Sequence, residues 1–139
     1  MVNYWLWVEK EGRIENEMEP DDEFEWEGCH YDTEEEDLIL IYRTRPYKRI
    51  QYLIKASSDS KLYPKNAVDE IYNCNCEVLY NFKDNSLQLK EMQDNNLLED
   101  WYPLKVNFVK MKFPIEEKFW NILKDLLIEK NPNSENLFE

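Results

Sequence analysis

One segment, residues 38–57, constrains the fold more than any other part of the sequence. Its first five residues, LILIY, are continuously apolar, and a strand covered on both faces has this composition. A turn is expected at residues 45–48, where Pro46 suits the second turn position. Apolar residues then alternate along 50–57, at Ile50, Tyr52, Ile54 and Ala56. The segment therefore predicts a β-hairpin.

The rest of the chain predicts further strands and one long helix. The additional strands are expected at residues 3–8, 76–82 and 105–111. The helix is expected over 115–130, with Pro114 in its first turn and an apolar stripe formed by Phe119, Ile122, Leu123, Leu126 and Leu127. Short helical turns are expected at 67–72 and 86–92, the second with Ser86 as one possible cap.

These elements together predict an α+β domain. Strands that are apolar along their whole length favour a curled sheet or barrel over a flat open sheet. We expect residues 1–130 to form this single domain, with the amphipathic helix at its C-terminal end. Residues 131–139 are expected to be a frayed tail.

Charge is distributed unevenly along the chain. Residues 9–37 hold fifteen acidic residues against Lys10 and Arg13, which accounts for the whole formal net charge of −13. By contrast, residues 38–57 contain no acid and five basic residues, namely Arg43, Arg45, Lys48, Arg49 and Lys55. The acidic segment 9–37 is expected to be a solvated loop, or alternatively a surface that binds a basic protein partner.

Composition disfavours several classes of protein. The chain has no apolar run of about eighteen residues, so we expect neither a transmembrane helix nor a membrane partner. Its first residues lack a basic region followed by a long apolar run, so we expect no signal peptide and a cytoplasmic location. Gly12 and Gly28 are the only glycines, which excludes glycine-rich phosphate loops. Three cysteines, an odd number, favour reduced thiols over a disulfide framework.

Side chains that could carry catalysis are few. Cys29, His30, Cys74 and Cys76 are possible zinc ligands, but their spacing does not match that of structural zinc sites. A Cys29–His30 pair also lacks a third group to orient it, and a single histidine limits acid–base catalysis. We therefore expect no metal, no cofactor and no enzymatic activity, with a small zinc enzyme kept as an alternative.

Aromatic and basic residues predict a binding site instead. Trp26 and Trp101 lie in polar stretches, where a large indole either packs or binds a ligand. Arg43 and Thr44 end one strand of the hairpin, and residues 57–59 end the other. These groups could hold a flat polar heterocycle by stacking and edge hydrogen bonds, with hairpin cations on phosphates. The structural alternative is that both tryptophans close the end of a barrel while the basic residues offset nearby acids.

Six stretches carry a resemblance that covers nearly the whole chain. They are YWLWV at the N-terminus, WEGC at Trp26–Cys29, DLILIYRTRPYKRIQYLIKASSD at Asp37–Asp59, CEVLYNF at Cys76–Phe82, DWYPLKVNFVKMKFPI at Asp100–Ile115 and the helix containing FWNILKDL. The run from YRT to KASSD is the most specific of them. In this order the stretches resemble the EVE domain family of the PUA-like superfamily.

The resemblance implies a PUA-like pseudo-barrel of mixed strands flanked by helices. It also implies a non-catalytic domain whose aromatic pocket takes a flipped, modified base, as related domains take methylated bases, from DNA or RNA. The residues implied for the base pocket are Trp26, Gly28, Tyr42, Thr44, Ser57, Ser58, Asp59, Trp101 and Asn107. The residues expected to contact phosphates are Arg43, Arg45, Lys48, Arg49 and Lys105. Trp26 would stack on the base, and Gly28 would allow close backbone approach.

Overall fold

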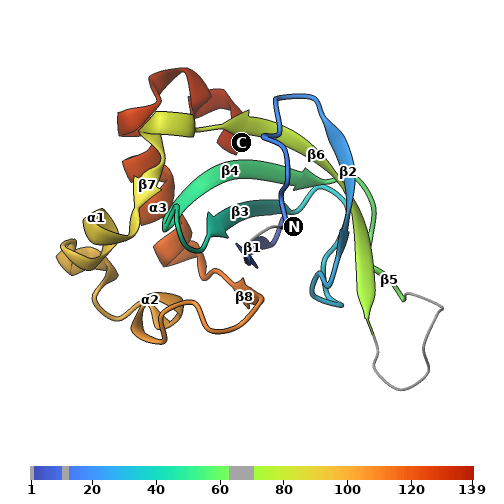
Figure 1. Cartoon of the computed structure of the whole chain (residues 1–139), viewed down its shortest axis with the longest axis horizontal. Coiled ribbons are helices and arrows are strands. Elements are labelled where there is room, and N and C mark those ends of the chain that lie inside the picture. The colour runs from blue at the N-terminus through green and yellow to red at the C-terminus, as the bar shows by residue number, and fades with distance from the viewer. Residues whose placement is uncertain (1, 11–12, 63–70) are drawn as a thin grey trace.

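The computed structural model describes residues 2–10, 13–62 and 71–139 and has an α+β fold (Figure 1). A curled β-sheet occupies the middle and right of this view, and the helices gather on its left. Within the described residues, no helix is long and apolar enough to cross a membrane. The helical turn expected at 67–72 falls mostly outside these residues, and Tyr72 begins a strand.

Eight strands form one sheet in the described part of the chain. They are β1 (Tyr4–Glu9), β2 (Glu23–Glu27), β3 (Leu38–Arg43), β4 (Arg49–Ala56), β5 (Lys61–Leu62), β6 (Tyr72–Asn81), β7 (Leu87–Gln88) and β8 (Lys112–Pro114). The main order is β2-β6-β4-β3-β1-β8, with β5 beside β6 and β7 beside β4. Only the β1–β3 pair is parallel among the pairs recorded for these residues.

The predicted hairpin is confirmed as β3 and β4, which pair antiparallel near the middle of the sheet. All six residues of β3 are buried, as expected for a strand covered on both faces. A register shift interrupts the β3–β4 ladder after Ile41, and another interrupts β4–β6 after Leu53. Such irregularities bend strands and increase their twist, which suits a sheet that curls.

The two faces of the sheet bury separate apolar clusters. Along β1, Leu6 and Val8 pack on the side of the helices, whereas Trp5 and Trp7 point the other way, because successive strand residues face opposite sides. We call the second cluster the inner core. It comprises Trp5, Trp7, Trp26, Cys29, Ile39, Ile41, Tyr52, Ile54, Ala56, Cys74, Cys76 and Val78.

Helices cover the opposite face of the sheet. The helical segments are η1 (Lys83–Asn85), α1 (Leu89–Gln93), η2 (Asn96–Leu98), α2 (Tyr102–Lys105), α3 (Glu117–Lys130) and η3 (Pro132–Phe138). The long helix predicted over 115–130 is confirmed as α3, and it buries Phe119, Trp120, Leu123 and Leu127. For α1, Gln88 rather than Ser86 is the N-cap, in a capping box with Glu91.

The strand predicted over 105–111 is wrong. Helix α2 ends at Lys105, and Asn107 and Phe108 have left-handed backbone angles, with φ of 51° and 54°. Phe108 is buried because its ring stacks on Tyr42, with the ring centroids 3.9 Å apart. The packing of this aromatic pair outweighs the alternating pattern, and a strand begins only at Lys112.

The prediction of a frayed tail at 131–139 is also wrong. The 3-10 helix η3 buries Ser134 and Phe138. The Phe138 ring packs against Phe82 and Trp120, at centroid distances of 6.4 Å and 5.9 Å. This hydrophobic contact anchors the end of the chain to the domain.

The prediction of reduced thiols fails for two of the three cysteines. Cys29 and Cys74 form a disulfide that joins residues 45 positions apart, and Cys76 is free and buried. The bond links the residue after Gly28 to strand β6. An odd number of cysteines therefore did not exclude a disulfide here.

Replacing Phe138 with alanine is expected to destabilise the protein by about 3 kcal/mol, because a buried aromatic ring is lost from the core. Chemical denaturation measures this change. Glu135→Ala, at an exposed position of the same 3-10 helix, is the control and should stay near wild type. If both variants are equally stable, the tail is frayed and the contact of Phe138 with the core is disproved.

Breaking the disulfide by Cys29→Ser is expected to cost about 2–4 kcal/mol, because the unfolded chain regains the freedom of a long closed loop. Denaturation with and without a reducing agent measures the effect. Reductant should destabilise the wild type but leave the Cys29→Ser variant unchanged. A wild type that is indifferent to reductant would contradict the cross-link.

Candidate functional site

Trp26 is sandwiched between two flat groups in the inner core. Its ring stacks on Trp7, with centroids 5.2 Å apart and planes at 11°. The guanidinium carbon of Arg13 lies 3.7 Å from the centroid of the Trp26 ring. A guanidinium at that height and a parallel indole cannot share one face, so they cover opposite faces. Arg13 thus occupies the position that a planar ligand stacked on Trp26 would take.

Backbone pairing fixes Trp26 in this position. Strand β2 pairs with β6, where Trp26 lies opposite Cys74. Gly28, two residues further on, has φ of +91° and no atom within 4 Å of the place a Cβ would take. Its role is therefore the backbone conformation that turns the chain after β2, because L residues rarely adopt that angle.

A buried ion pair lies where β1 and β3 end. Glu9 and Arg43 are neighbours in the parallel register, and Arg43 Nε donates to Glu9 Oε1 at 2.8 Å. Each side chain is only 3% exposed. Thr44 Oγ1 donates to the Glu9 carbonyl at 3.1 Å. Because a buried charge without its partner is strongly unfavourable, this pair holds the Arg43 guanidinium in one orientation.

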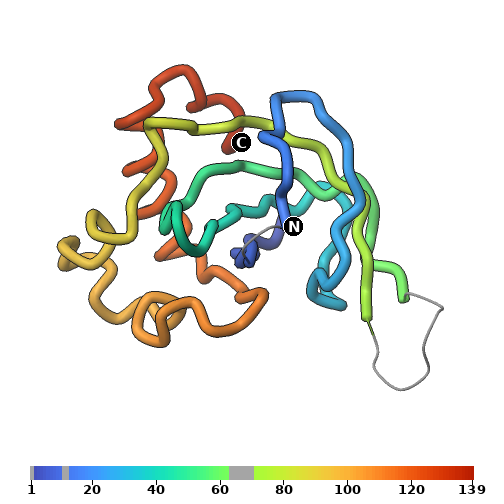
Figure 2. Tube along the Cα trace, in the orientation of Figure 1, coloured from blue at the N-terminus to red at the C-terminus, as the bar shows by residue number. Residues whose placement is uncertain are grey.

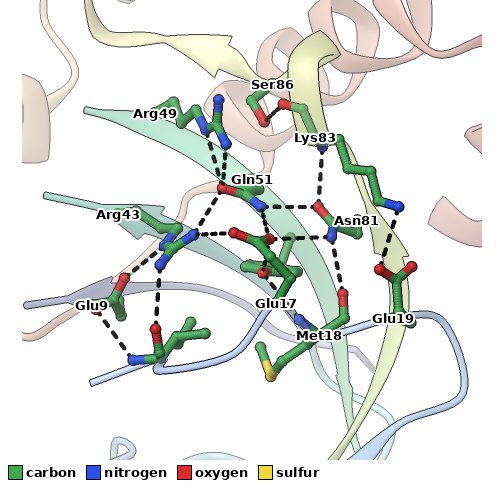
Figure 3. A network of polar contacts seen from close by, with 12 residues as sticks. Glu9, Glu17, Met18, Glu19, Arg43, Arg49, Gln51, Asn81, Lys83 and Ser86 are labelled. Carbon is green, nitrogen blue, oxygen red and sulfur yellow. Dashed lines mark hydrogen bonds and ion pairs between the residues drawn. The ribbon is translucent and has the colours of Figure 1, made fainter. Parts of the chain in front are cut away.

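The Glu17 carboxylate lies between Arg43 and Asn81 and completes a polar network (Figure 3). It accepts hydrogen bonds from Arg43 Nη1 at 3.0 Å, Gln51 Nε2 at 2.6 Å and Tyr52 Oη at 2.8 Å. Asn81 Nδ2 is a fourth donor, at 3.5 Å. Although Glu17 is half-exposed, all four donor residues are buried. We call these donors the socket.

Residues 13–18 bind across this end of the sheet as a separate peptide would. Figure 2 shows the chain after β1 crossing in front of the strands before it returns as β2. Arg43 Nη2 donates to the Ile14 carbonyl at 3.4 Å, and Asn81 Nδ2 donates to the Met18 carbonyl at 2.9 Å. The Met18 amide donates to Tyr52 Oη at 3.2 Å. Several of the segment's contacts with the sheet are therefore polar.

A cavity of about 660 Å³ opens elsewhere, beside Trp5 and Tyr31. Asp59 and Thr33 also line it, and the Thr33 hydroxyl is buried without a partner among the described residues. Its charged lining residues are all acidic: Asp32, Glu34, Asp59 and Glu117. It is not the pocket predicted from the sequence, because Trp26 does not line it and it has no positive rim.

The structure does not bring the predicted pocket residues together. Tyr42 and Trp101 pack in the cluster on the helix side, away from Trp26 in the inner core. Asn107 is exposed in the turn after α2. Of the residues expected in the pocket, Thr44 follows Arg43 of the socket and binds the Glu9 carbonyl, whereas Trp26 contacts the 13–18 segment through Arg13.

Residues 57–59 lie at the opposite end of β4 from the socket. Ser58 Oγ accepts from the Asn75 amide at 3.1 Å, and Asp59 Oδ1 accepts from the Glu35 amide at 2.8 Å. Both side chains thus hold loop backbone. The sequence shows that these residues end a strand, but β4 is eight residues long, so its two ends are far apart.

The predicted phosphate contacts divide into buried and exposed cations. Arg43 is buried in ion pairs, and Arg49 is half-buried with bonds to Gln51 of 3.0 Å and 2.9 Å. Arg45 and Lys48 are exposed in the turn between β3 and β4. Lys105 is exposed on α2, with Asp100 3.7 Å away.

Sequence reasoning missed Arg13, Glu17, Gln51 and Asn81. The first two are hidden in a segment whose composition predicts a solvated loop. Gln51 lies within the alternating strand, at a position expected to be polar, yet it is buried. No local pattern distinguishes such residues from surface residues, because their partners are distant in sequence.

No protein-family model and no curated protein matches this chain. Solved structures do resemble it. The NMR structure of Rpa0253 from Rhodopseudomonas palustris has a TM-score of 0.72 at 14% identity, covering 90% of this chain and 92% of its own. The crystal structure of PSPTO5229 from Pseudomonas syringae has a TM-score of 0.70 at 18% identity, covering 89% and 99%.

A third similar structure is the crystal structure of Atu2648 from Agrobacterium tumefaciens. Its TM-score is 0.67 at 14% identity, with 94% of each chain covered. At these identities the likeness establishes the fold alone. All three share a mixed α+β architecture with this chain over almost its whole length.

The stability of the protein is expected to fall in acid partly through Glu17. Burial opposes its charged form, but hydrogen bonds from Tyr52, Arg43 and Gln51 outweigh burial, so the pKa of Glu17 is lowered. Its contribution is present above the ordinary glutamate pKa of about 4.3 and is lost as the pH falls through the lower folded value. Denaturation at pH 7 and pH 3 should show a smaller acid-induced loss for Glu17→Gln than for wild type. Equal losses would contradict the network.

Proposed function

We propose that this protein binds a modified nucleobase, a methylated base turned out of DNA or RNA, on the face of Trp26 that Arg13 covers. The observation that carries the proposal is the Trp7–Trp26–Arg13 sandwich, with the guanidinium 3.7 Å from the Trp26 centroid. A nucleobase is flat like a guanidinium, and stacking on an aromatic ring contributes about 1–3 kcal/mol per base. The base would replace the Arg13 side chain.

Polar groups near this stacking position support recognition of a base edge. Arg13 precedes Ile14, whose amide lies 3.4 Å from Glu9 Oε2 and whose carbonyl lies 3.4 Å from Arg43 Nη2. Displacing the segment would therefore free one acceptor on Glu9 and one donor on Arg43, both now bound to the residue after Arg13. Flipped bases are read by stacking together with such edge hydrogen bonds.

Two exposed cations support contact with the nucleic-acid backbone. Arg45 and Lys48 lie in the turn that follows Arg43, and the structure records no ion pair for either of them within the described residues. Phosphate contacts of this kind supply affinity without sequence preference and make binding depend on salt. Arg43 and Arg49 are better placed to bind the hydrogen-bonding edge of the base than to reach phosphates.

Support for a finer assignment, a PUA-like pseudo-barrel of the EVE kind, comes from the order of the sequence motifs and from the curled sheet.

The proposed function involves binding without chemistry. Burial raises the pKa of the Cys76 thiol to about 12, which disfavours the reactive thiolate. The His30 ring is stacked between Trp5 and Tyr31, at 4.6 Å and 4.4 Å.

Replacing Arg13 with alanine is expected to strengthen binding of a methylated oligonucleotide by up to about tenfold. The reason is that a cation–π contact, worth about 0.5–2 kcal/mol, no longer competes for Trp26. Fluorescence anisotropy with methylated and unmethylated DNA and RNA, at low and moderate salt, measures the affinity.

Lys10→Ala is the matched control, because it removes an exposed positive charge close to the same segment. It should bind no more tightly than wild type. The proposal fails if neither wild type nor Arg13→Ala binds any of the oligonucleotides with a salt dependence, because phosphate contacts require one.

A further inference from the structure

Beyond Gln51, the two terminal nitrogens of Arg43 donate only to the 13–18 segment in the recorded hydrogen bonds. The guanidinium carbon also lies 3.8 Å from the centroid of the Tyr47 ring. Arg43 Nε is bound to Glu9, which fixes the plane of the guanidinium. Nη1 then donates to Glu17 Oε1 at 3.0 Å and to Gln51 Oε1 at 3.2 Å, while Nη2 donates to the Ile14 carbonyl. An arginine fork of this kind matches two coplanar acceptors.

The other residues of the socket donate further hydrogen bonds to the Glu17 carboxylate. Gln51 Nε2 and Tyr52 Oη both donate to Glu17 Oε2, at 2.6 Å and 2.8 Å. The orientation of the Gln51 amide is set by Arg43 and Arg49, which both donate to its oxygen. The group seated in the socket must therefore accept hydrogen bonds.

Burial makes an empty socket unfavourable. With Glu17 in place, Gln51 is 1% exposed and Tyr52 is fully buried, so their hydrogen bonds to Glu17 are shielded from water. A buried donor left without a partner loses the stability that its hydrogen bond supplied. Glu17, by contrast, is half-exposed, on a segment that spans from β1 to β2. Exchange of Glu17 for another acceptor would satisfy the socket.

We propose that the socket is an acceptor-specific binding subsite, and that Glu17 is its built-in competitor. The group it takes presents two acceptor atoms in one plane, as a carboxylate does and as the O6 and N7 atoms of guanine do. Binding of a guanine base in the socket depends on the proposed base-binding function. Binding of a free carboxylate does not. A group that presents only donors to the Arg43 guanidinium and the Gln51 amide nitrogen is rejected.

Glu17→Ala tests this subsite, with acetate as the probe. Acetate should raise the melting temperature of the variant saturably, and calorimetry should give an affinity at least about tenfold above that of wild type, whose own carboxylate competes. Sodium chloride at equal ionic strength should not reproduce the effect. Glu15→Ala removes a neighbouring exposed carboxylate and should respond to acetate as wild type does.

A second substitution assigns the acetate to the socket. Adding Tyr52→Phe to Glu17→Ala removes one donor hydroxyl and keeps the buried ring, so acetate affinity should fall by about tenfold. Should the alanine variant not fold, Glu17→Gln should also gain acetate affinity, because it keeps one acceptor oxygen and places an amide donor where the second oxygen was. The subsite is disproved if acetate and chloride act equally, or if the tyrosine hydroxyl makes no difference.

Nucleotide probes separate this inference from the proposed function. Guanosine monophosphate should bind Glu17→Ala more tightly than wild type, and its 7-deaza analogue, which lacks the N7 acceptor, should bind less tightly than the parent nucleotide. Binding of acetate without guanosine monophosphate would support the subsite and count against base recognition there. Oligonucleotide binding with no acetate response in any variant would support base recognition and overturn the subsite.

Discussion

The buried charge of Arg43 is the constraint on which the rest of this end of the molecule depends. A guanidinium that is almost fully removed from water needs acceptors around it, and one comes from Glu9 on the neighbouring strand. The second comes from Glu17, which brings the segment after β1 back across the sheet. Through Arg13 that segment then covers Trp26. Two ion pairs of one arginine thus link the acidic part of the chain to the basic hairpin.

This arrangement explains why an acidic protein carries an acid-free hairpin. Arg43 is buried and forms ion pairs with Glu9 and Glu17. Lys55 Nζ lies 3.7 Å from a carboxylate oxygen of Glu36. Of the five hairpin cations, only Arg45 and Lys48 in the turn are exposed with no recorded ion pair in the described residues. In the edge strand β2, exposed acidic residues alternate with Phe24 and Trp26. Charged side chains on an edge strand hinder its pairing with the edge of another sheet.

Much of the fold could be predicted from local pattern, whereas the site could not. Strand β4 and helix α3 follow from apolar residues repeated at a fixed interval, and β3 follows from a continuously apolar run. The strand expected at 105–111 failed because Phe108 packs on a tyrosine far away in sequence. The tail was misjudged for a similar reason, since Phe138 is held by Phe82 and Trp120.

The sequence by itself determined the α+β class, the central hairpin, the amphipathic helix and the concentration of acid in residues 9–37, because these depend on neighbours along the chain. Tertiary structure alone decided that Trp26 lies between Trp7 and Arg13, that Cys29 meets Cys74, and that Glu17 enters a buried socket. The physical reason is that the curled sheet brings together residues that are far apart in sequence. No local sequence pattern indicates that such residues will be in contact.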